Sequence, residues 1–125
     1  MAFKIAPFYN IHNSVGRGAG GSGSDVMLVQ YMLFHVCVMP DPHFRSNRGE
    51  WTPVAPAGLG PGAIYPFTGL YTTELDQWIS AFQEAANSRG MGVLTVDGRI
   101  NRAPVGWGKH IKLTSGRWYT IQALN

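Results

Sequence analysis

Apolar residues recur at helical spacing in two separate parts of the chain. In the first, Val26, Val29 and Leu33 share one stripe, and further apolar residues occupy the other sides of the same stretch. Ser24 is a suitable N-cap for a helix that Pro40 ends. Because this helix is apolar nearly all round, we expect it to be buried in a core or in an intermolecular contact.

The second stretch predicts the clearest helix. Its apolar positions follow the i, i+3, i+4, i+7 spacing of one helical face: Leu75, Trp78, Ile79 and Phe82. We expect Thr72 or Thr73 to cap its start, and Asn87 and Gly90 to end it. Trp78 is expected in the core.

The remaining segments read as extended pieces and loops around a mainly α domain. Residues 1–23 are an extended N-terminal arm and a glycine-rich segment, and 24–101 form the helical domain. Within it, the insert 40–68 holds six of the eight prolines, with Trp51, Tyr65 and Phe67 as apolar anchors. Asp97-Gly98 signals a turn. The tail 102–125 is basic and aromatic, and a β-hairpin from about Lys109 to Ala123 is predicted.

Charge is scarce and uneven. Charged residues make up 14% of the chain, and the net charge is +3. No acidic residue follows Asp97, whereas five basic residues do: Arg99, Arg102, Lys109, Lys112 and Arg117. They are candidate contacts for an anionic partner, with a solvated basic face as the commoner explanation. So small a net charge disfavours nucleic acid as the partner.

No catalytic arrangement is visible. The four histidines lack metal-ligand spacing, and only Asp41-Pro42-His43 forms a weak pair. The single Cys37 lies in an apolar run, and the glycine tract lacks the ending of a phosphate loop. We therefore expect no enzyme activity, metal or cofactor. With no apolar run typical of a signal peptide or a membrane span, we expect synthesis in the cytoplasm.

Several motifs together resemble the small helical peptidoglycan-binding domain. In the first helix these are Asp25-Val26, Val29-Gln30 and Leu33. In the second unit they are Gly69, Tyr71, Ile79, Phe82 and Gln83, and Val93 to Gly98 match the closing turn. The similarity covers 24–39 and 68–101. Thr68, Thr72, Thr73 and Leu75 depart from the family pattern, and the insert is longer than usual.

The resemblance implies a helical bundle that binds peptidoglycan or another wall glycan without catalysis and anchors or guides a partner. The residues that it nominates as ligand-binding are Tyr71, Thr72, Thr73, Gln30 and Gln83. For the two glutamines an alternative stays open, in which their side-chain amides hold loops.

A second function also stays open. Wall-binding modules without a hydrolase resemble parts of phage tails and related injection machines. The chain would then be a structural or assembly subunit that contacts other protein subunits and no longer binds the wall. It would act in a virion or tail-like assembly, whereas the first hypothesis places it at the bacterial cell wall.

Overall fold

The protein is a small, mainly helical structure with two principal helices, a two-stranded antiparallel sheet and much loop. The computed structural model describes residues 9–38, 56, 58–88, 96–104 and 119–124. In chain order the elements are β1 (Val15–Gly16), α1 (Gly23–Leu33), the π-helical turn η1 (Phe34–Val38), the 3-10 turn η2 (Pro61–Ala63), α2 (Thr73–Ser88), β2 (Arg99–Ile100) and α3 (Thr120–Leu124).

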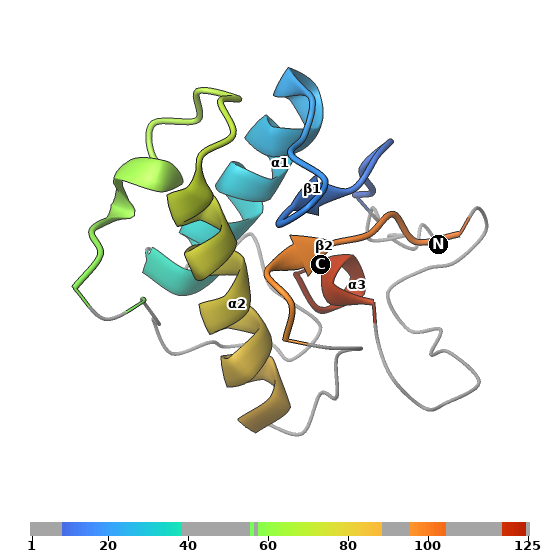
Figure 1. The fold of residues 1–125 in the computed structure, drawn as a ribbon. Helices are drawn as coiled ribbons and strands as arrows, with labels where there is room; N and C mark the ends of the chain where they lie inside the picture. The colour runs from blue at the N-terminus through green and yellow to red at the C-terminus, as the bar shows by residue number, and fades with distance from the viewer. Residues whose placement is uncertain (1–8, 39–55, 57, 89–95, 105–118, 125) are drawn as a thin grey trace, which may run out of the picture.

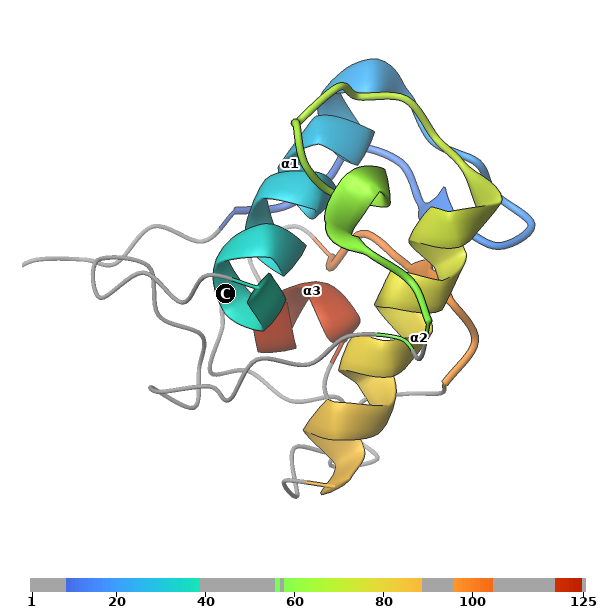
Figure 2. The same ribbon diagram turned by 90° about the vertical axis from the view of Figure 1, so that its left-hand side faces the viewer.

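The two long helices form the centre of the molecule. Figure 1 shows η2 and the chain around it on one side of α2, and β1, β2 and α3 on the other side. In Figure 2 the η2 segment lies in front of α1 and α2, and α3 is seen behind them. Short elements therefore cover the helix pair on two opposite sides, η2 on one side and β1, β2 and α3 on the other.

The core lies where these layers meet. Val29 and Leu33 of α1 and Phe82 of α2 are completely buried, as the apolar stripes predict. Trp78 is also buried, which confirms its expected core position. Met27 and Tyr31, in contrast, are exposed on the outer side of α1. The expectation that this helix is buried nearly all round therefore holds for most of its surface only.

The helix boundaries are close to those expected. α2 covers Thr73–Ser88, as its caps predict. α1 begins at Gly23 with Ser22 at the N-cap, two residues before the predicted cap Ser24. The helix then continues into the π-helical turn η1, whose last residue is Val38.

The glycine-rich segment is part of the fold. β1 pairs with β2 so that Val15 lies opposite Ile100 and Gly16 opposite Arg99. Gly16 and Gly20 exchange two backbone hydrogen bonds of 2.8 Å, which close a tight loop directly after β1. The Arg17 N–H donates to the Gly98 carbonyl at 3.0 Å and fixes this loop to the turn before β2.

The predicted C-terminal hairpin is wrong at its end. Residues Thr120–Leu124 form helix α3, although the prediction extended a strand to Ala123. Ile121 and Leu124 are both fully buried, and their spacing of three residues places them on one helical face. Thr120 is fixed by a hydrogen bond from Gln83 on α2. Residues 105–118 of the predicted hairpin lie outside the described part of the chain.

Asp25 attaches the N-terminal arm to the start of α1. Its buried carboxylate accepts hydrogen bonds from the backbone N–H groups of His12 at 2.9 Å and Asn13 at 3.0 Å. The Ser22 hydroxyl donates to it as well, at 3.0 Å. Burial alone would raise the pKa of this carboxyl, but these three hydrogen bonds and the nearby charge of His12 lower it below its ordinary value.

We predict that Asp25→Asn lowers the free energy of unfolding at neutral pH by about 1–3 kcal/mol, because the amide cannot accept all three hydrogen bonds. Because the pKa of Asp25 is lowered in the folded state, its ionised carboxylate stabilises the fold fully at pH values above its ordinary pKa of about 4. This contribution is lost as the pH falls through the folded-state pKa. Urea denaturation between pH 7 and pH 3 should therefore show the wild-type advantage shrinking in acid. Glu84→Gln, at an exposed site on α2, is the matched control.

Candidate functional site

The buried Gln30 side chain joins α1 to the segment that leads into α2. Its Nε2 donates to the carbonyl of Ala63 at 3.1 Å and to the hydroxyl of Thr68 at 3.3 Å. Its Oε1 accepts the N–H of Gly69 at 2.9 Å. All three partners lie more than 30 residues away in sequence, so this one amide fixes the path of a distant segment along α1.

The buried Gln83 side chain has the same role one helix later. Its Oε1 accepts the N–H groups of Asp97 and Gly98, each at 3.0 Å. Its two Nε2 hydrogens are shared among three acceptors, the Arg99 carbonyl at 3.0 Å, the Thr120 hydroxyl at 3.0 Å and the Asp97 carboxylate at 3.1 Å. Gln83 thereby holds the Asp97-Gly98 turn and the start of α3 against α2.

The two glutamines are two copies of one arrangement. Each accepts the N–H of a glycine in the left-handed region, Gly69 at φ 73° and Gly98 at φ 70°. A Cβ on Gly69 would lie only 2.7 Å from the Gly23 carbonyl oxygen, and one on Gly98 would lie 3.1 Å from that of Asp76. Both positions therefore favour glycine, through their left-handed φ and these close contacts. The amides therefore hold loops, which is the alternative role that the sequence left open for Gln30 and Gln83.

Tyr71 is joined to a buried carboxylate on α2. Its hydroxyl donates to Asp76, whose two carboxylate oxygens lie 2.9 and 2.8 Å away. Burial, the hydrogen bond and the negative charge of Asp76 raise the pKa of Tyr71, whereas the positive charge of Arg17 acts in the opposite direction. The half-buried Tyr71 ring packs against the core. The hydroxyl of Tyr71 thus holds the first turn of α2 through Asp76, and its ring is packed against the core.

Thr72 and Thr73 are the nominated residues that remain exposed. They lie at the start of α2, where the Thr72 carbonyl accepts the N–H of Leu75 at 3.1 Å. The structure therefore brings Tyr71, Thr72 and Thr73 together at one helix end and places Gln30 and Gln83 in the interior.

The described cations gather around the small sheet. Arg99 lies in β2 and donates from Nε to the Asn101 side chain at 3.0 Å, and Arg102 is exposed two residues beyond the strand. The exposed Arg17 joins them through the β1 loop. Sequence reasoning did not select Arg17, because it stands alone in a glycine tract. Lys109, Lys112 and Arg117 lie outside the described residues.

A five-ring aromatic cluster also went unrecognised in the sequence. It joins the end of α1 and the start of η1 to the segment after η2, and its members are Tyr31, Phe34, His35, Tyr65 and Phe67. The Phe34 and Tyr65 rings are stacked, with centroids 4.7 Å apart and planes at 21°. Phe67 meets Tyr31, Phe34 and Tyr65 edge-on at 5.4–5.6 Å. Tyr65 and Phe67, two of the three expected anchors of the insert, thus contact the end of α1 and η1, whereas Trp51 and residues 39–55 lie outside the described part.

Potential metal-ligating side chains do not cluster among the described residues. Within these ranges, no group of three or more His, Cys, Asp or Glu side chains could hold a metal ion. Burial raises the pKa of the Cys37 thiol to about 12, which suppresses its thiolate form. The weak Asp41-His43 pair lies outside the described residues. No described helix is long and apolar enough to cross a membrane.

Comparison with known proteins adds no relative. No protein-family model, no curated protein and no solved structure matches the chain.

We predict that Gln83→Leu lowers the free energy of unfolding by roughly 3 kcal/mol, because the backbone groups and the Thr120 hydroxyl that it serves lose a buried partner. Gln30→Leu should cost less, roughly 2 kcal/mol, because Gln30 has three hydrogen-bonding partner atoms and Gln83 has five. Urea denaturation measures both values.

The matched control is Gln77→Leu, at an exposed glutamine of the same helix. It should change the free energy of unfolding by no more than about 0.5 kcal/mol. Equal losses for Gln77→Leu and Gln83→Leu would contradict the assigned role of the buried amide.

Proposed function

We propose that the protein is a non-catalytic peptidoglycan-binding module, built as a variant of the small helical wall-binding bundle, that anchors or guides a partner at the bacterial cell wall. One observation carries this proposal. The residues behind the resemblance do not lie scattered, since Val29, Gln30 and Leu33 of α1 and Ile79, Phe82 and Gln83 of α2 belong to one buried unit.

The repeated glutamine–glycine arrangement supports this proposal. Gly69 and Gly98 are the turn residues of the two matching motifs, and each is held by the glutamine of the preceding motif. A chance likeness in sequence would not require these pairs to meet in space. Because packing and turn geometry alone can preserve such residues, the arrangement supports the scaffold more strongly than the ligand.

Wall contact in this proposal falls on the exposed start of α2. Thr72 and Thr73 are exposed hydroxyl-bearing residues, and the half-buried Tyr71 directly precedes them. Hydroxyl and aromatic groups side by side suit a sugar, which offers both hydroxyls and apolar C–H faces. Arg99 and Arg102 would add attraction to anionic wall polymers.

A second candidate function is an assembly subunit of a phage particle or tail-like injection machine. It is favoured by large apolar side chains on the surface, among them Leu70 at 68% exposed and Met27 at 46% exposed. Such residues gain free energy when a neighbouring subunit covers them.

We predict that the purified protein co-sediments with insoluble peptidoglycan sacculi and that binding persists at high salt. Interactions between exposed charges weaken strongly as salt rises, whereas hydroxyl and ring contacts persist. Binding that disappears at high salt would show charge attraction alone and would contradict a specific wall site. No binding at either salt concentration would favour the assembly subunit.

A paired substitution tests the proposed contact residues. The double variant Thr72→Ala, Thr73→Ala should reduce salt-resistant sedimentation with sacculi by a few-fold, because it removes two exposed hydroxyls and leaves the core unchanged. Ser88→Ala, at an exposed hydroxyl at the other end of α2, should leave sedimentation unchanged. Equal sedimentation of all three proteins would remove the start of α2 from the binding site.

A further inference from the structure

The aromatic cluster presents part of its surface to solvent in a fixed arrangement. Tyr65 is 51% exposed although its ring stacks on Phe34, and Tyr31 is 37% exposed although Phe67 contacts its edge. A stacked ring loses little further conformational freedom when a ligand covers it. The surface is therefore preorganised for binding, unlike an isolated exposed side chain.

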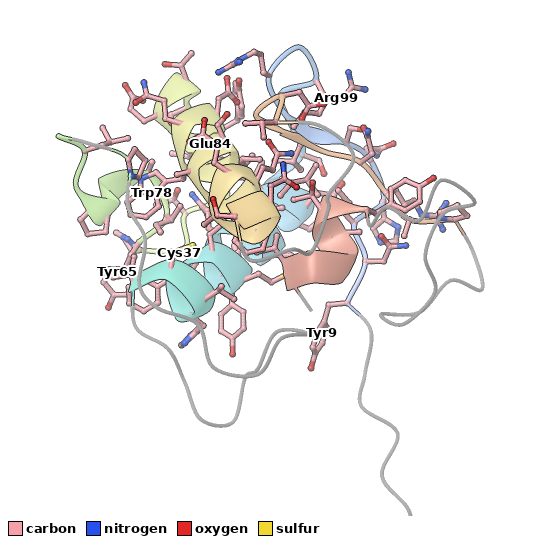
Figure 3. All side chains as sticks on the ribbon, turned by 90° about the horizontal axis from the view of Figure 1, so that it is seen from below. Tyr9, Cys37, Tyr65, Trp78, Glu84 and Arg99 are labelled. Carbon is pink, nitrogen blue, oxygen red and sulfur yellow. The ribbon has the colours of Figure 1, made fainter. Side chains whose placement is uncertain are left out.

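The cluster contains no acidic side chain and no Lys or Arg. The described cations lie around β1 and β2. In Figure 3 Tyr65 and Arg99 lie at opposite sides of the molecule. An anionic ligand would find no counter-charge among these five rings, so their chemistry suits an uncharged ligand better than a carboxylate.

The polar atoms of the cluster lie at ring edges. Tyr31 and Tyr65 each combine an apolar ring with a phenolic hydroxyl, whereas the Nδ1 atom of His35 is buried within the cluster. This combination suits a pyranose, whose C–H face packs on a ring while its equatorial hydroxyls and acetamido group reach hydrogen-bonding groups at the edge. The peptide stems of a bacterial wall carry carboxylates, for which these rings offer no counter-charge.

We propose that the aromatic cluster of Tyr31, Phe34, His35, Tyr65 and Phe67 is a glycan-binding surface that takes the uncharged N-acetylglucosamine rings of a wall strand. This inference rests on the proposed wall-binding function and specifies which part of the polymer is recognised. It adds a site that the resemblance does not nominate, because none of the five residues belongs to the matching motifs.

The test is calorimetric titration with a short oligomer of N-acetylglucosamine and, separately, with free wall peptide stems. The wild-type protein should bind the oligomer and not the peptide. Tyr65→Ala should weaken oligomer binding roughly tenfold, the loss expected for one stacked ring. Tyr9→Ala is the matched control, because Tyr9 is 44% exposed and lies well away from Tyr65 in Figure 3.

Thermal unfolding of both variants checks that the fold is retained. Equal oligomer binding by Tyr65→Ala and Tyr9→Ala would overturn the proposal, as would binding of the peptide instead of the oligomer. A concentration-dependent dimer that Tyr65→Ala abolishes would overturn it too, because the cluster would then be an interface between copies of this chain.

Sedimentation with sacculi separates this inference from the proposed function. Salt-resistant binding to sacculi that Tyr65→Ala leaves unchanged would overturn the glycan surface while wall binding stands. Oligomer binding that depends on Tyr65, without binding to sacculi, would support the glycan surface and contradict the wall-binding function.

Discussion

A buried amide that must satisfy its hydrogen bonds is the constraint on which the fold depends. A glutamine in the interior is costly unless its donors and acceptor find partners. Gln30 and Gln83 meet this requirement with backbone groups of loops that lie far away in the sequence. Each helix therefore determines where the following turn lies. Gln30 thereby positions the residues that lead into α2, and Gln83 positions the turn before β2 and the first residue of α3.

The sequence predicts what local spacing encodes. The apolar stripe of Leu75 to Phe82 specifies α2 to within a residue or two, and the same reasoning finds α1. α3 was missed because a short apolar run has no resolvable period, and its first residue is fixed by Gln83, 37 residues earlier. The aromatic cluster was missed for a related reason, since no spacing rule joins Phe34 to Tyr65, which lies within the insert.

The nominated site shows the same limit. Both glutamines stand out in the sequence, but their spacing alone cannot distinguish an amide that faces a ligand from one that holds a loop. The structure places their partners 39 and 15 residues away, at Gly69 and Gly98. Residues that carry a resemblance can thus be the ones that the scaffold uses, and the proposed function therefore assigns recognition to exposed groups such as Thr72, Thr73 and Tyr65.

Hydrogen exchange at the Gly69 and Gly98 amides tests the central claim most directly. If Gln30 and Gln83 hold these turns, both amides should exchange as slowly as the core amides of α2, although neither lies within a helix. The Gly18 amide, at the exposed tip of the β1 loop, provides the fast comparison. Exchange of Gly69 and Gly98 at a rate close to that of Gly18 would contradict the account, because the turns would then open independently of the helices.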